Sequence, residues 1–329
     1  MSLPREGLRR LLERSRRASW RNFGKKIWFY APGIIHYESQ YFRAEKPSFA
    51  AISVTGSFCA LKCDHCRGQI LRSMLPATSP SQLVRICRKL KAAGVRGCLI
   101  SGGCLPDGSV PLRRFTAAIA KVVHEIGMEV IVHTGLLDEG TAVALKDAGV
   151  SAVLFDVIGS EETIREVYHL RRRVEDYERT LEVASEVGIP SVPHVVVGLH
   201  YGRLLGELEA LEMIARHRPA AVVVVALMPL EGTPMEHVRP PSPQEIARVL
   251  AYARSLMPST PIVLGCARPR GPHRTKTDIL AIMAGANAIA FPSDEAVQVA
   301  RALGLDTRFS GTCCAFIFKD IRALAGPNP

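Results

Sequence analysis

The chain has 329 residues, of which 47% are hydrophobic, and a formal net charge of +11. This length and composition suffice for a sizeable folded core. They exclude a membrane-spanning or secreted protein, because no charge-free stretch reaches the about 18 residues of a membrane helix and no signal-like apolar segment follows the N-terminus. Nine cysteines without a secretion signal are typical of a reducing compartment. We therefore expect a cytoplasmic protein with no membrane partner.

The N-terminal segment is strongly basic. Residues 1–26 contain nine Arg or Lys and two Glu, and Leu8, Leu11, Leu12 and Ala18 give it a partial helical stripe. Such a segment favours an acidic partner through electrostatic attraction. Nucleic acid is disfavoured, because no aromatic interleaving or known binding motif accompanies the charge. A solvated basic helix without a dedicated partner is an equal alternative. We treat residues 1–45 as a basic N-terminal extension.

Apolar, β-branched runs then alternate with amphipathic stretches. Gly94, Gly149 and Gly188 stand where helices would end before the next run. The eight runs are residues 51–55, 98–101, 129–133, 152–157, 192–197, 221–227, 262–265 and 286–291. Eight is the count of a closed parallel barrel. We expect a TIM-like (β/α)8 barrel over residues 46–305, with active-site groups at the carboxyl ends of its strands. Residues 306–329 form a C-terminal segment that carries two cysteines.

Three cysteines follow the first run within eight residues. Cys59, Cys63 and Cys66 have the spacing C-x3-C-x2-C. Three cysteine ligands on a four-iron cluster leave one iron open to a substrate. A zinc knuckle, or a disulfide pair with a spare thiol, is the alternative. His65 is an awkward fourth zinc ligand because it lies directly beside Cys66.

This spacing resembles the signature of the radical S-adenosylmethionine (radical SAM) enzymes. The resemblance implies a 4Fe–4S cluster on Cys59, Cys63 and Cys66, whose open iron binds S-adenosyl-L-methionine (SAM) and whose electron splits SAM to a 5′-deoxyadenosyl radical. Ferredoxin or flavodoxin would be the electron donor. The residue before the last cysteine is usually aromatic in this superfamily, and here His65 would stack on adenine instead.

The resemblance also implies SAM contacts at later strand ends. Ser101-Gly102-Gly103 resembles the Gly-Gly-Glu-like turn that meets the SAM amino group, although Cys104 replaces the acid. Asp156 matches the position of ribose-binding groups, the alternative being an ordinary strand-end cap. Gly198 lies in a degenerate form of the adenine platform. Met228-Pro229 opens a Gly-Thr-Pro-containing loop similar to that of biotin synthase.

Biotin synthase and lipoyl synthase carry a second iron–sulfur cluster that donates sulfur. We expect Cys266, Cys313 and Cys314 to hold such an auxiliary cluster here, with Arg268, a serine or an external group at the remaining position. Biotin synthase uses an arginine ligand from a late strand, but Arg268 would equally bind a carboxylate. The alternative for Cys313 and Cys314 is a buried filler plus an incidental thiol. The other three cysteines are weaker candidates for ligands. We expect Cys87 to belong to the hydrophobic core, Cys98 lies at the strand end opposite the active site, and Cys104 has no companion cysteine nearby in the sequence.

The chain also resembles the LipS-type, two-protein lipoyl synthases. The resemblance is carried by Thr55-Gly56, the Gly265–Pro269 run and Cys313-Cys314. That resemblance implies a sulfurtransferase acting on an octanoyl chain of a carrier domain or octanoyl-lysyl peptide, with a second radical SAM subunit as partner. The alternatives are a biotin synthase-like or other cofactor-assembly reaction on a small free substrate, or a non-catalytic iron–sulfur scaffold or redox sensor. We expect His133, His194 and His200 to be hydrogen-bonded wall residues.

Overall fold

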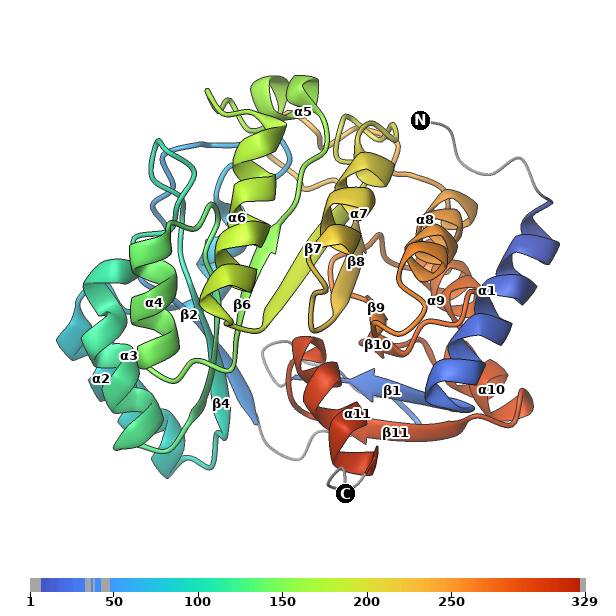
Figure 1. Cartoon of the computed structure of the whole chain (residues 1–329), viewed down its shortest axis with the longest axis horizontal. Helices are drawn as coiled ribbons and strands as arrows, with labels where there is room; N and C mark the ends of the chain where they lie inside the picture. Colours follow the sequence, from blue (N-terminus) through green and yellow to red (C-terminus); the bar gives the residue numbers. More distant parts are fainter. Residues whose placement is uncertain (1–6, 33–36, 38, 43–47, 326–329) are drawn as a thin grey trace.

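The computed structural model describes residues 7–32, 37, 39–42 and 48–325 (Figure 1). Parallel strands form a curved sheet, and helices cover its outer face. Within the described part of the chain, no helix is long and apolar enough to cross a membrane.

All eight predicted strands are present and occur side by side in chain order. They are β2 (Phe49–Ser53), β4 (Gly97–Ser101), β5 (Glu129–His133), β6 (Ala152–Asp156), β7 (Ser191–Val197), β8 (Val222–Ala226), β9 (Ile262–Leu264) and β10 (Ala288–Ala290). Every neighbouring pair is parallel. Their carboxyl ends therefore share one edge of the sheet, where the sequence places the site residues.

Three further strands extend the sheet beyond the prediction. They are β1 (Lys26–Tyr30), β3 (Leu75–Pro76) and β11 (Asp306–Ser310), giving the order β11-β1-β10-β9-β8-β7-β6-β5-β4-β2-β3. β1 and β11 lie outside the range 46–305 that we assigned to the barrel. Among the residues that the structure describes, β11 and β2 do not pair, so the expected closed barrel is an open one. The Ser48 hydroxyl donates to the Gly311 carbonyl across this opening.

The helices have local sequence signals at their ends. Ser242 and Glu245 form a capping box at α8, and Gly94, Gly149 and Gly188 adopt the positive φ expected after a helix. The helices are α1 (Leu8–Phe23), α2 (Pro80–Ala92), α3 (Thr116–His124), α4 (Glu139–Asp147), α5 (Glu161–Glu166), α6 (Val174–Val187), α7 (Glu207–Arg216), α8 (Pro243–Leu256), α9 (Pro272–Met283), α10 (Asp294–Ala302) and α11 (Ile317–Ala325), with 3-10 turns η1 (Gln69–Ser73), η2 (Leu112–Phe115) and η3 (Cys314–Phe316).

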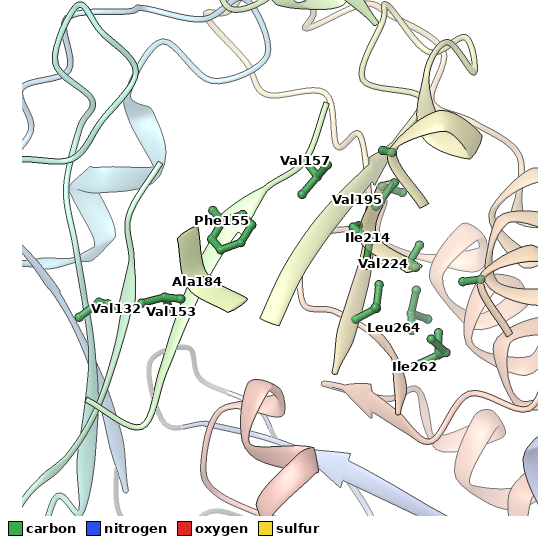
Figure 2. Close-up of a cluster of buried hydrophobic side chains, with 14 of the residues drawn as sticks. Val132, Val153, Phe155, Val157, Ala184, Val195, Ile214, Val224, Ile262 and Leu264 are labelled. Carbon is green, nitrogen blue, oxygen red and sulfur yellow. The ribbon is translucent and has the colours of Figure 1, made fainter. Parts of the chain in front are cut away.

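The strands bury both faces, as a parallel sheet must. Val132, Val153 and Val224 belong to the core between sheet and helices, shown in Figure 2. Their neighbours along the strands belong to a second cluster inside the barrel, which includes Ile131 and Leu154. This alternation places His133, Asp156 and His194 on the interior face at the carboxyl ends of β5, β6 and β7.

The basic N-terminal segment is a docked helix. Leu11 and Leu12 of α1 are buried, and the Ser15 hydroxyl donates to the Ala284 carbonyl at 2.6 Å. Leu8 and Ala18, also in the predicted stripe, are partly buried. The opposite face of the helix exposes Arg10, Arg14, Arg17 and Arg21. The charge is therefore held on a fixed surface rather than on a free arm.

The C-terminal segment enters the barrel interior through η3 and α11. Phe316 and Ile317 lie in the interior core, and the Phe316 ring meets Phe49 edge-on with ring centroids 5.7 Å apart. Beyond them, Lys319 Nζ contacts Glu129 Oε1 at 2.8 Å, at the amino end of β5. η3 and α11 therefore fill the lower interior, with Cys313 directly before η3 and Cys314 as its first residue.

Candidate functional site

The predicted cluster loop joins β2 to η1 and gathers three free thiols. Cys63 and Cys66 are buried and Cys59 is partly buried. Burial raises the pKa of the Cys66 thiol to about 11, and burial together with Cys66 and Cys59 raises the pKa of Cys63 further. Thiols this close and this desolvated are unfavourable as free thiolates. Binding to iron cations would offset both penalties, so the donor set fits a cluster.

Asp64 anchors this loop to two other loops of the rim. Its amide donates to Val167 O at 3.0 Å, and its carboxylate accepts hydrogen bonds from His169 Nε2 at 3.0 Å and from the Tyr201 hydroxyl at 2.7 Å. Burial alone would raise the pKa of Asp64, but these two hydrogen bonds lower it below its usual range. His169 and Tyr201 both have positive φ, at 57° and 49°. Strained residues at this anchor indicate a constrained functional loop.

The Asp64 anchor could not be predicted from the sequence. Its only sequence signal is an acidic residue between two cysteines, and its partners lie 105 and 137 residues further along the chain. His65, the next residue, has a buried Nδ1 with no hydrogen-bond partner, and its ring centroid lies 5.5 Å from that of Tyr168. Burial lowers the pKa of His65, so the imidazole is neutral. An orphaned ring nitrogen beside an aromatic ring fits the expected adenine neighbour.

The Ser101-Gly102-Gly103-Cys104 turn packs directly on the cluster loop. Gly103 N donates to Thr55 Oγ1 at 2.7 Å, and a Cβ at residue 103 would lie 2.0 Å from Phe58 O. Glycine is therefore required here by the cluster loop itself. Cys104 lies near the thiols of Cys59 and Cys66, although we expected it to have no companion cysteine. Burial, Cys59 and Asp156 raise the pKa of its thiol to about 12.

Asp156 lies among polar interior side chains at the end of β6. Its Oδ1 is 3.7 Å from His133 Nε2, and its Oδ2 accepts a hydrogen bond from the Tyr168 hydroxyl at 3.3 Å. Burial would raise the pKa of Asp156, but His133, His194 and His65 outweigh it and hold the pKa at about 2. The carboxylate is thus an ionised acceptor. Its assignment to the ribose hydroxyls stays a prediction.

The remaining predicted SAM contacts lie at the same edge. Gly198 directly follows β7 with a φ of +73°, and a Cβ there would meet Pro241 at 2.6 Å. Its amide donates to Glu207 Oε1 at 2.8 Å. Met228 and Pro229 follow β8 and are partly buried. The structure explains Gly198 by packing, and the SAM-binding role of all three residues stays a prediction.

The structure brings Cys266, Cys313 and Cys314 together, as the sequence suggested. The thiols of Cys313 and Cys314 are hydrogen-bonded, which lowers the pKa of Cys313 and raises that of Cys314. The Cys266 side chain is itself exposed, but its crowded surroundings and the nearby Cys313 raise the pKa of its thiol. This second group of thiols joins the end of β9 to the C-terminal segment. By contrast, Cys87 and Cys98 are fully buried in the core, where their thiols are hydrogen-bonded to each other.

Arg268 does not supply the fourth ligand that we considered. Its buried guanidinium donates to both oxygens of Asp278, at 2.7 and 3.1 Å, and to the carbonyls of Gly265 and Phe291. A guanidinium whose nitrogens donate to these oxygens presents no lone pair to iron. Arg268 instead fixes the loop that carries Cys266. A serine or an external group is left for the remaining position.

Comparison with known proteins agrees with this geometry. Residues 53–204 match the model of the radical SAM superfamily, and residues 224–324 match the biotin and thiamin synthesis associated domain. The chain is 28% identical over 271 residues to biotin synthase of Xanthomonas campestris, covering 78% of this chain and 77% of that protein. It is 29% identical over 272 residues to biotin synthase of Hyphomonas neptunium, covering 78% and 81%.

Two solved structures share the fold. Methylornithine synthase (PylB) has a TM-score of 0.64 at 18% identity, covering 97% of this chain and 93% of that one. The FeFe-hydrogenase maturase HydG from Carboxydothermus hydrogenoformans has a TM-score of 0.64 at 16% identity, covering 93% and 72%.

An open parallel barrel with three clustered thiols after its first predicted strand defines an enzyme that binds a 4Fe–4S cluster together with SAM. The chain belongs to the radical SAM superfamily, on its biotin synthase and lipoyl synthase side.

Proposed function

We propose that this enzyme inserts sulfur into an unactivated C–H bond, with an auxiliary iron–sulfur cluster on Cys266, Cys313 and Cys314 as the sulfur donor. The observation that carries the proposal is the second group of thiols, which is separate from the cluster loop and converges from β9 and the C-terminal segment. All three cysteines lie within the range 224–324 of the biotin and thiamin synthesis associated domain. The biotin synthase relatives support the same class of reaction.

The substrate we favour is a small free molecule, as in a biotin synthase-like reaction. The relatives point to that chemistry rather than to an octanoyl chain on a carrier domain. The interior supports it, because apolar Ile131 and Leu154 lie below the polar group of His133, Asp156 and His194. Such a site suits a molecule with an aliphatic part and a hydrogen-bonding head.

The protein's own residues would prepare the reaction in three ways. When bound, the 4Fe–4S cluster and SAM supply the one-electron chemistry for hydrogen-atom abstraction. Asp64 holds the cluster loop in place, and Asp156 offers an ionised acceptor to hydroxyl groups. The interior core and the C-terminal segment keep water from the lower barrel.

The test is anaerobic reconstitution with ³⁴S-sulfide, followed by turnover with SAM, a reductant and the sulfur-free precursor of biotin. We expect 5′-deoxyadenosine and a ³⁴S-containing product. The Cys313→Ala/Cys314→Ala variant should still form 5′-deoxyadenosine but release no sulfur product, with iron falling from about eight to about four atoms per chain. Cys87→Ala is the matched control, because this buried cysteine lies in neither group. Unchanged iron in the double variant would refute the sulfur-donor assignment.

The second candidate is the octanoyl substrate of a LipS-type lipoyl synthase. It is favoured by the exposed arginines of α1, which would suit an acidic carrier domain. An octanoyl-lysyl peptide supplied with a second radical SAM subunit separates the two candidates by product mass. A non-catalytic scaffold or redox sensor would form no 5′-deoxyadenosine in either assay.

A further inference from the structure

A third group of metal-binding side chains lies on the rim, apart from both groups of cysteines. His200 follows β7 and is 1% exposed, whereas Glu162 and Glu166 lie one turn apart on α5. His200 Nε2 is 3.5 Å from Glu162 Oε1 and 3.9 Å from Glu166 Oε2. One ligand atom from each of the three lies within 4.8 Å of the other two.

These separations do not suit direct hydrogen bonds. An N–H···O hydrogen bond spans about 2.7–3.2 Å, and both distances from His200 Nε2 exceed it. Two ligands on a tetrahedral cation, each bound at about 2.0–2.1 Å, lie about 3.4 Å apart. The 3.5 Å between His200 Nε2 and Glu162 Oε1 matches this spacing, and a small rotation of the Glu166 side chain, now 3.9 Å away, would bring all three ligand atoms around one cation.

The other ring nitrogen of His200 is held as in metal sites. Thr163 Oγ1 lies 3.3 Å from His200 Nδ1, and it also lies 3.5 Å from the Leu205 carbonyl, to which it donates. The hydroxyl can then accept the Nδ1 proton, which leaves the Nε2 lone pair directed at two carboxylates. Metal-bound histidines are oriented by such a partner. Without a cation or an added proton, this arrangement is repulsive.

The charges around the group leave room for a cation. Arg165 binds Oε1 of Glu166 at 2.9 Å, so that Oε2 remains directed at His200. Both glutamates are partly exposed, with 49% and 42% of their side chains accessible, so water can complete the coordination. We propose that Glu162, Glu166 and His200 bind one divalent cation of the zinc class, with water in the open position.

The site would join the two loops that hold the cluster loop. α5 leads to Val167, whose carbonyl accepts the Asp64 amide, and His200 precedes Tyr201, whose hydroxyl binds the Asp64 carboxylate. A cation shared by α5 and the loop after β7 fixes the distance between these two supports. The inference does not depend on which substrate receives sulfur.

The test uses the reconstituted holoenzyme, in which the clusters already occupy the cysteines. Anaerobic calorimetric titration with Zn²⁺ should show about one ion per chain. Titration with Co²⁺ should give weak visible bands without the strong thiolate-to-cobalt absorption, since the ligands are nitrogen and oxygen. Glu162→Gln/Glu166→Gln should abolish both signals, and Mg²⁺ should give none.

Glu161→Gln is the matched control on the same helix, because its amide oxygen can still accept from Val174 N. It should bind Zn²⁺ as the wild type does. The replaced carboxylates of the double variant are partly exposed and amides of the same size take their place, so its melting temperature without Zn²⁺ should equal that of the control. The proposal is overturned if the wild type takes up neither ion, or if the double variant takes up as much as the wild type.

Discussion

Replacement of Tyr201 by phenylalanine removes a single oxygen atom and tests whether the Tyr201–Asp64 hydrogen bond stabilises the cluster loop. The change removes the hydroxyl that donates to Asp64 Oδ2 at 2.7 Å and keeps the ring that meets His200 at 5.3 Å between centroids. A hydrogen bond to a charged group contributes about 1.5–3 kcal/mol. Asp64 is only 8% exposed, so water replaces this bond poorly.

The loss should appear mainly in the cluster loop, because Asp64 stands directly between Cys63 and His65. If the hydrogen bond resists opening of this loop, its removal should speed iron loss by about tenfold to a hundredfold, since 1.4 kcal/mol is a factor of ten. The assay is the anaerobic rate of iron transfer to a chelator, followed by absorbance. Binding of SAM should slow the release in both proteins.

Tyr252→Phe is the matched control. The Tyr252 hydroxyl donates to Glu212 Oε1 at 2.5 Å, between α8 and α7 and outside the cluster loop. This variant should release iron at the wild-type rate. Equal rates for Tyr201→Phe and the wild type, or equally fast release from Tyr252→Phe, would contradict the role of the Asp64 anchor.

Three further predictions follow from single contacts. Gly103→Ala places a Cβ 2.0 Å from Phe58 O and should prevent full iron incorporation, whereas Gly7→Ala, with nothing within 4 Å, should not. Burial raises the pKa of Glu207 to about 7, so folding favours its protonated form and stability is lost as pH rises from the ordinary carboxyl pKa to about 7. Glu207→Gln should therefore be more stable than the wild type at pH 8, by up to about 3 kcal/mol, and nearly equal at pH 4.5, as denaturant titrations would show. Arg268→Met leaves Asp278 buried without its partner and should lower the free energy of unfolding by about 3–5 kcal/mol, with Arg268→Met/Asp278→Leu recovering most of it.

The sheet was largely predictable because its strands are buried on both faces. Runs such as residues 221–227 are continuously apolar and β-branched, and the confirmed glycines mark the preceding helix ends. β11 was missed because the sequence Asp306–Ser310 is mostly polar, as an edge strand permits. β1 is apolar, but only pairing with β10 and β11, from the far end of the chain, makes it part of the sheet.

The candidate site also contains residues that could be predicted from local sequence and residues that could not. Cys59, Cys63 and Cys66 could be identified because their spacing is local. The role of Arg268 could not be predicted, because an arginine that follows a strand can either ligate iron or bind a carboxylate. Only the folded structure shows that it pairs with Asp278. We expected His200 to be a wall residue because its neighbours Glu162 and Glu166 lie on helix α5, far from it in the sequence.

We expected both a closed barrel and a cluster that joins Cys266 to the C-terminal cysteines, and the open side of the barrel explains how these cysteines can meet. A closed eight-stranded barrel leaves no lateral entrance, so its C-terminal cysteines would have to approach the interior from the rim. Here β11 ends beside the opening, Gly311 is bound by Ser48 on the other side, and the chain turns inward at Cys313. Phe316 and Ile317 then bury themselves in the interior core and hold the two cysteines beside Cys266. The missing closure of the sheet is thus what allows a terminal segment to contribute thiols to the interior. Truncation after Ser310 should therefore remove iron from the second group and also destabilise the barrel, whereas Cys313→Ala/Cys314→Ala should remove the iron alone.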